Sequence, residues 1–140
     1  MDKVYLAIPG APDKLLGHVQ EDGKIYRSRV GLDEHVGGVD LTSGKIYESQ
    51  FGPDKKVGYV DLKSGKVYLS KLGLDEYVGR VDGDGRMHRH VTMGIDEYIG
   101  KVDHFLSRAH SAGAMLLLVL PALLAKKPEE PDQENKDATQ

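Results

Sequence analysis

The chain has 140 residues, no cysteine, and a net charge of −3 in which acidic and basic side chains alternate along the sequence. The length predicts a single domain, and the lack of cysteine excludes disulfides and thiolate metal sites. The charge balance argues against a nucleic-acid-binding surface, which needs a basic patch. The N-terminus has no basic region followed by an apolar run. We therefore expect no secretory signal peptide, and a location in the cytoplasm or on the cytoplasmic face of a membrane.

Two short motifs alternate along the chain from its start to Asp103, with a repeat of about 21 residues. The first reads V-G-x-V-D or a close variant, and its glycines are Gly17, Gly37, Gly58, Gly79 and Gly100. The second reads K-[IV]-Y-x-S and begins at Lys3, Lys24, Lys45 and Lys66, with a degraded copy at Arg86. Both motifs are short, rich in Val, Ile and Tyr, and bounded by Gly and Asp, which is typical of strands.

Tight, glycine-containing links join the motifs, so the pattern predicts about ten strands arranged as five β-hairpins. The chain begins at Asp2-Lys3 inside one such link, and the repeats stop at Asp103, at the start of the same kind of link. The first and last strands can therefore pair, which removes both sheet edges. We predict an all-β fold for residues 1–103: a shallow, closed antiparallel barrel of five hairpin repeats.

The period of two along a strand assigns side chains to the two faces of this barrel. Tyr68 and Leu72 share one face, and Val67 and Leu69 share the other. We assign the Tyr68 face to the interior, together with Gly79. The repeated valines and tyrosines are then expected to fill the barrel with the help of Val30, Phe51 and Leu72.

The repeated tyrosines occupy equivalent positions and are expected to form a ring near one mouth of the barrel. They are Tyr5, Tyr26, Tyr47 and Tyr68. Such a ring could face a ligand, because tyrosine presents an apolar body and a polar tip. Symmetric packing in the core is the simpler interpretation, and we favour it.

The strings V-G-x-V-D, S-G-K-[IV]-Y-x-S and G-L-D-E resemble those of the β-flower proteins, which are radially symmetric all-β domains of four or five hairpins. The resemblance extends from Lys3 to Asp103. It implies the fold and a shallow apolar channel, and no established activity. The chain departs from the pattern at His88 and His90, which replace Tyr and Ser.

His88 and His90 lie two apart on one predicted strand, so they are the weak candidates for a metal site, with His104 or His18 as a third ligand. No cysteine or carboxylate stands beside the pair in the sequence, and we favour simple drift of two repeat positions. The recurrent aspartates before the tight links are interpreted as turn formers rather than a calcium site. They are Asp40, Asp61, Asp82 and Asp103. The sequence contains no recognisable catalytic motif, so we predict a protein that is not an enzyme and has no cofactor.

Residues 104–127 are predicted to form an apolar helix, and the polar residues 128–140 a disordered tail. The centre of the helix is Met115, Leu116, Leu117, Leu118, Val119 and Leu120. It is apolar on every side, which is typical of a helix that is either wholly buried in a protein or embedded in lipid. With the barrel filled by its own side chains the helix stays unburied, which favours the membrane.

Three functions follow from these alternatives. The first is a non-enzymatic structural or binding module associated with membrane lipid through its C-terminal helix. The second is a soluble barrel that is plugged by this helix and binds a small apolar ligand. A histidine-based metalloenzyme is the third and least favoured. The sequence leaves the oligomeric state open.

Overall fold

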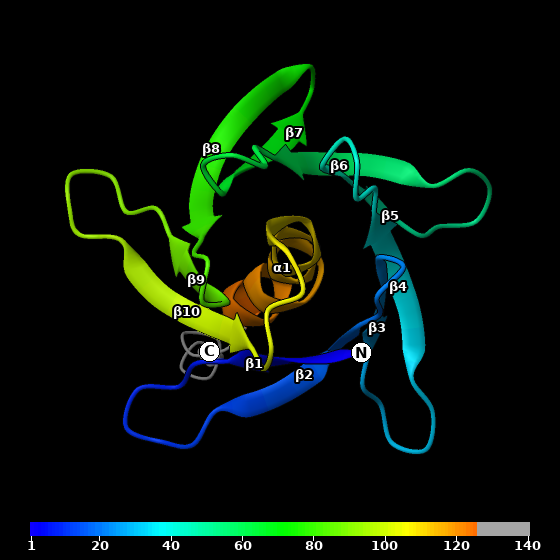
Figure 1. The fold of residues 1–140 in the computed structure, drawn as a ribbon, viewed down its shortest axis with the longest axis horizontal. Helices are drawn as coiled ribbons and strands as arrows, with labels where there is room; N and C mark the ends of the chain where they lie inside the picture. Colours follow the sequence, from blue (N-terminus) through cyan, green and yellow to red (C-terminus); the bar gives the residue numbers. More distant parts are fainter. Residues whose placement is uncertain (126–140) are drawn as a thin grey trace, which may run out of the picture.

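The computed structural model describes residues 1–125, which form a closed ring of ten strands around a central helix (Figure 1). The strands are β1 (Asp2–Leu6), β2 (Lys14–Val19), β3 (Lys24–Arg27), β4 (Glu34–Val39), β5 (Lys45–Glu48), β6 (Lys55–Val60), β7 (Lys66–Lys71), β8 (Leu74–Val81), β9 (Arg86–Arg89) and β10 (Glu97–Val102). A single helix runs from Arg108 to Ala125 and contains α1 (Arg108–Ala114) and the π-helical segment η1 (Met115–Val119). The tail predicted for residues 128–140, and the last two residues of the predicted helix, lie outside the described part.

The predicted closure is confirmed, because β1 pairs antiparallel with both β2 and β10. Val4 faces Val102 across the seam, and the Asp103 N–H donates to the Lys3 carbonyl at 3.1 Å. The His104 N–H donates to the buried carboxylate of Asp2 at 2.7 Å. The seam therefore replaces the missing tight turn, and the sheet has no free edge.

A β-bulge in every repeat corrects the predicted faces. Val67 pairs with Gly79 and Tyr68 pairs with Tyr77, so Val78 is an extra residue without a cross-strand partner. Such an insertion shifts the inward–outward alternation by one residue. Val67 is fully buried and Val78 packs against the core. The Tyr68 ring instead lies on the outer face, where it contacts Tyr77.

The bulge recurs at equivalent positions around the ring, always one residue before the motif glycine. The extra residues are Leu16, Val36, Val57, Val78 and Ile99. The predicted inward position of Gly79 is confirmed by its buried environment, whereas the assignment of Tyr68 and Leu72 to the interior is wrong. The assignment failed because strict alternation holds only within an uninterrupted strand.

The helix fills the barrel, which is the plugged arrangement left as an alternative by the sequence. By length and composition Arg108–Ala125 is apolar enough to cross a bilayer, yet 61 % of it is buried inside the protein. Val30, Phe51 and Leu72, which were expected to fill the interior, are instead fully exposed at loop tips. The core consists of inward aliphatic side chains from the strands packed against Ala109–Val119.

The π-helical segment presents one side chain to each repeat. Met115 contacts the Gly79 position on β8, Leu116 that of Gly58 on β6, and Leu117 that of Gly37 on β4. Leu118 lies with Leu16 of β2, and Val119 contacts the Gly100 position on β10. These five strands are every second strand of the ring, met in this order around it.

Fivefold symmetry explains why this segment is not α-helical. The five units stand ~72° apart around the ring, whereas an α-helix turns ~100° per residue. A helix with i→i+5 bonds turns less per residue, and the Leu120 N–H does donate to the Met115 carbonyl. The wider turn brings successive side chains closer to the spacing of the repeats.

Polar contacts hold the beginning of the helix beside the tight turns of the barrel. Ser107 is the N-cap, and its hydroxyl accepts from the His110 N–H at 3.2 Å. His110 Nε2 lies 2.8 Å from the Glu21 carbonyl oxygen, and Arg108 Nη1 donates to the Lys63 carbonyl at 3.2 Å. The helix therefore enters at the tight-turn end and runs toward the opposite end.

Candidate functional site

The aspartates before the tight turns act as turn formers in two of the four predicted cases. Asp40 Oδ1 accepts from the N–H groups of Thr42 and Ser43, and Asp61 Oδ1 accepts likewise from Lys63 and Ser64. These backbone hydrogen bonds lower the pKa of both carboxyls, because they favour the ionised form. The turn interpretation is confirmed for this pair.

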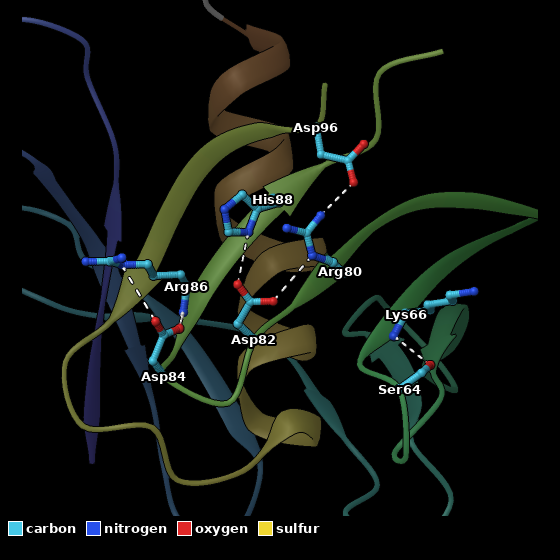
Figure 2. A network of polar contacts seen from close by, with 8 residues as sticks. All are labelled: Ser64, Lys66, Arg80, Asp82, Asp84, Arg86, His88 and Asp96. Carbon is cyan, nitrogen blue, oxygen red and sulfur yellow. Dashed lines mark hydrogen bonds and ion pairs between the residues drawn. The ribbon is translucent and has the colours of Figure 1, made fainter. Parts of the chain in front are cut away.

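Asp82 belongs instead to a chain of alternating charges on the outer face (Figure 2). His88 Nδ1 lies 3.5 Å from Asp82, whose other oxygen accepts from Arg80 Nε at 3.3 Å. Arg80 Nη1 donates to Asp96 at 2.6 Å, and His90 Nδ1 lies 3.3 Å from the second Asp96 oxygen. The fold thus brings both predicted histidines to the ends of one network centred on Arg80.

The centre of this network is electrostatically satisfied. Partial burial raises the pKa of Asp96, but the Val91 N–H, His90 and Arg80 together lower it below the ordinary value. Within residues 1–125 no group of three or more metal-binding side chains is assembled. His18 is stacked on Tyr26, and His104 pairs with Asp2, so neither predicted third ligand accompanies His88 and His90.

The tyrosines predicted to line the barrel lie on its outside as a result of the bulges. Tyr26 is stacked on His18 and tilted against His35, and Tyr68 is stacked on Tyr59 and tilted against Tyr77. Tyr5 and Tyr47 occupy the equivalent positions on β1 and β5. These ladders are cross-strand pairs that stabilise the sheet. These tyrosines therefore lie around the outside of the barrel and do not line a ligand channel. The interior is filled by the helix.

A group of exposed apolar side chains lies at the tips of the hairpins that radiate from the ring (Figure 1). We call these hairpins petals; they are β1–β2, β3–β4, β5–β6, β7–β8 and β9–β10. We call the exposed side chains the apolar crown. Its members are Val30, Leu32, Phe51, Leu72, Leu74, Met93 and Ile95. Four petals contribute to the crown, and the β1–β2 petal instead turns Ile8 toward the core.

The second half of the helix emerges among the bases of the petals, where grooves separate them. The most apolar groove lies between the β7–β8 petal, β9 and the helix, and has a volume of about 530 Å³. Leu69, Val78, Leu116, Leu120 and Leu124 line its floor. Its rim carries Lys71, Glu76, Arg89 and His90. We call this the β8–β9 groove.

The sequence analysis did not identify the crown, because it assigned three of its members, Val30, Phe51 and Leu72, to the interior of the barrel. A signal was available, because all seven members lie directly beside a further set of glycines that recurs every 21 residues, Gly31, Gly52, Gly73 and Gly94, where a hairpin must turn. Turning residues lie at the surface, and so do their apolar neighbours.

Comparison of the chain with family models, curated proteins and solved structures gave no match. The β-flower resemblance therefore stays a prediction about family membership, while the closed ten-strand barrel that it implied is present.

Proposed function

We propose that this protein is a non-enzymatic module that docks on the surface of a lipid bilayer through its apolar crown. The observation that carries the proposal is the complete exposure of Val30, Phe51, Leu72 and Met93, one at the tip of each of four petals. Groups of exposed apolar side chains on soluble domains mark sites of contact with a protein or a membrane.

The arrangement of the tips favours a bilayer over a protein partner. The petals hold their tips apart around the ring (Figure 1), and equivalent positions in a fivefold repeat lie at similar heights along its axis. A flat, fluid surface meets all such tips at once, whereas a protein would need a matching set of separated pockets. Each tip presents only one or two apolar side chains, which suits shallow insertion at the interface.

The charges near the tips favour neutral lipids. Basic residues such as Arg29, Lys55 and Lys71 alternate with a slight excess of acidic residues such as Asp33 and Glu76. Attraction to an anionic surface needs a net basic patch. Docking is therefore expected on zwitterionic membranes and with little dependence on salt.

This route differs from anchoring through the helix. The side chains of Met115–Val119 are packed against the barrel wall and would have to leave it to enter lipid. The crown needs no such rearrangement, because its side chains are already in solvent.

Sedimentation with phosphatidylcholine vesicles tests the proposal. The wild type should bind at both about 0.1 M and about 1 M salt. The variant Phe51→Ser/Leu72→Ser/Met93→Ser should lose about a hundredfold in partitioning, if each tip contributes about 1 kcal/mol, roughly half the value for full burial. The matched control is Leu41→Ser/Leu62→Ser, whose leucines are each 38 % exposed but lie at the tight-turn end. A wild type that stays in the supernatant contradicts the proposal, as does equal loss of binding in the two variants.

A further inference from the structure

We propose that the β8–β9 groove binds a single-chain anionic amphiphile, of the class of medium- and long-chain carboxylates. This site is separate from the crown, and the proposal does not depend on docking to a bilayer.

The groove has the size and the lining of a small-molecule site. Its volume of about 530 Å³ lies within the ~300–1,000 Å³ range of ligand pockets. The floor is aliphatic and comes from three elements, so a chain lying there contacts a strand, a bulge and the helix at the same time.

Two local features of the fold open this groove. The β7–β8 petal ends in a two-residue turn, with φ of 49° at Leu72 and 82° at Gly73, so its strands remain regular to the tip and form a tall wall. The opposite strand, β9, ends at Arg89, and the chain leaves the sheet at His90. Leu124 extends the floor at the end of the helix and is 54 % exposed.

The other grooves between petals lack this combination. The groove beside β3–β4 and β5–β6 is smaller, about 320 Å³, and is lined by Arg27, Glu34 and Glu48. The groove beside β2 and β3 ends on Arg27 and Arg29, and its helical wall narrows to Ala122 and Ala125. The β8–β9 groove alone among these three is floored by three leucines of one helix, at positions 116, 120 and 124.

The rim explains the preference for an anionic head. Arg89 is held by Glu97 through two nitrogens and is already neutralised. Lys71 Nζ lies 3.6 Å from Glu76, and both side chains are more than 60 % exposed, so this pair is weak and readily exchanged. An amphiphile whose chain lies on the floor can therefore place its carboxylate beside Lys71 in place of Glu76.

The test uses decanoate and decanol, which share a chain and differ in the head group, titrated as monomers into the full-length protein without vesicles. Isothermal titration calorimetry should detect saturable binding of decanoate at one site and weaker binding of decanol. Lys71→Glu should lower decanoate affinity at least fivefold and leave decanol unchanged. An equal effect on both compounds would overturn the assignment of the head group.

Filling the groove provides the second arm. Leu124→Trp should lower the affinity for both compounds at least tenfold, while Leu62→Trp, at the tight-turn end, should change neither. Thr92→Trp on the groove wall serves the same purpose if Leu124→Trp does not fold, as judged by circular dichroism. Absence of saturable decanoate binding to the wild type, or equal effects of the groove and control variants, would overturn the proposal. The Phe51→Ser/Leu72→Ser/Met93→Ser variant should bind decanoate normally, so failure of the crown and failure of the groove are distinguishable.

Discussion

The Cε atom of Met115 lies 2.7 Å from the position that a Cβ atom would occupy on Gly79. The absence of a side chain on β8 therefore makes room for a side chain of the helix. The same relation links Leu116 to Gly58 at 2.6 Å and Leu117 to Gly37 at 2.8 Å. The recurrent glycines thus form the inner wall against which the π-helical segment packs.

Substitution of Gly79 by alanine should destabilise the protein by about 1–3 kcal/mol, the typical cost of overpacking. The added Cβ would overlap both Met115 and the carbonyl oxygen of His88, and the latter belongs to the backbone and yields little. Chemical denaturation followed by circular dichroism measures the loss. Gly83→Ala is the control, because its Cβ would meet nothing within 4 Å and should change stability by less than about 0.5 kcal/mol. Equal midpoints for the two variants would contradict the packing described here.

Truncation after Asp103 should unfold the barrel. Met115–Val119 are five large buried side chains, and each contributes about 1.5–3 kcal/mol by leaving water. Their sum is comparable with the whole stability of a typical domain, about 5–15 kcal/mol. Far-ultraviolet circular dichroism and amide dispersion in NMR spectra would report the loss. Truncation after Ala125 is the control and should remain folded. A folded fragment 1–103 would instead support the sequence-based expectation that the strands fill the interior unaided.

Replacing Leu117 and Leu118 together by lysine should also unfold the protein in solution. Both side chains are buried in the barrel, where an unpaired ammonium group carries a large desolvation cost. Leu124→Lys is the control, because that side chain is about half exposed and should tolerate the charge. Thermal unfolding in the absence of lipid separates this outcome from membrane anchoring by the helix. In that alternative the double variant would stay folded and soluble.

The carboxyl of Asp96 should make stability depend on pH in the acid range. Its folded-state pKa is lowered, so its contribution is present above the pKa of the unfolded chain, near 4, and is lost as pH falls through the folded-state pKa. The wild type should therefore unfold at a higher temperature than Asp96→Asn at neutral pH, and the difference should shrink below about pH 4.

The control for this prediction is Asp54→Asn, in the β5–β6 loop, which forms no ion pair within residues 1–125. Its melting temperature should follow that of the wild type across the acid range. A constant difference between Asp96→Asn and the wild type at every pH would show that the amide acts through packing rather than through charge.

The strands and their closure into a ring were predictable from the sequence alone. Val, Ile and Tyr between Gly-containing turns are local signals, and the position of Asp2 relative to Asp103 shows that one turn is missing from the cycle. The turn roles of Asp40 and Asp61 were predictable for the same reason, because their partners lie two or three residues away.

Only the tertiary structure decided which side chains face inward and what fills the ring. Each bulge depends on which residue pairs across to the neighbouring strand, so the alternation through Tyr68 and Val78 could not be followed along one strand. The same shift moved the tyrosines outward, whereas Leu72 is exposed because it lies in the two-residue turn of its hairpin. The composition of an apolar helix does not distinguish a place in lipid from a place in a protein core. The space that Met115 occupies exists because Gly79, which is distant in the sequence, has no side chain.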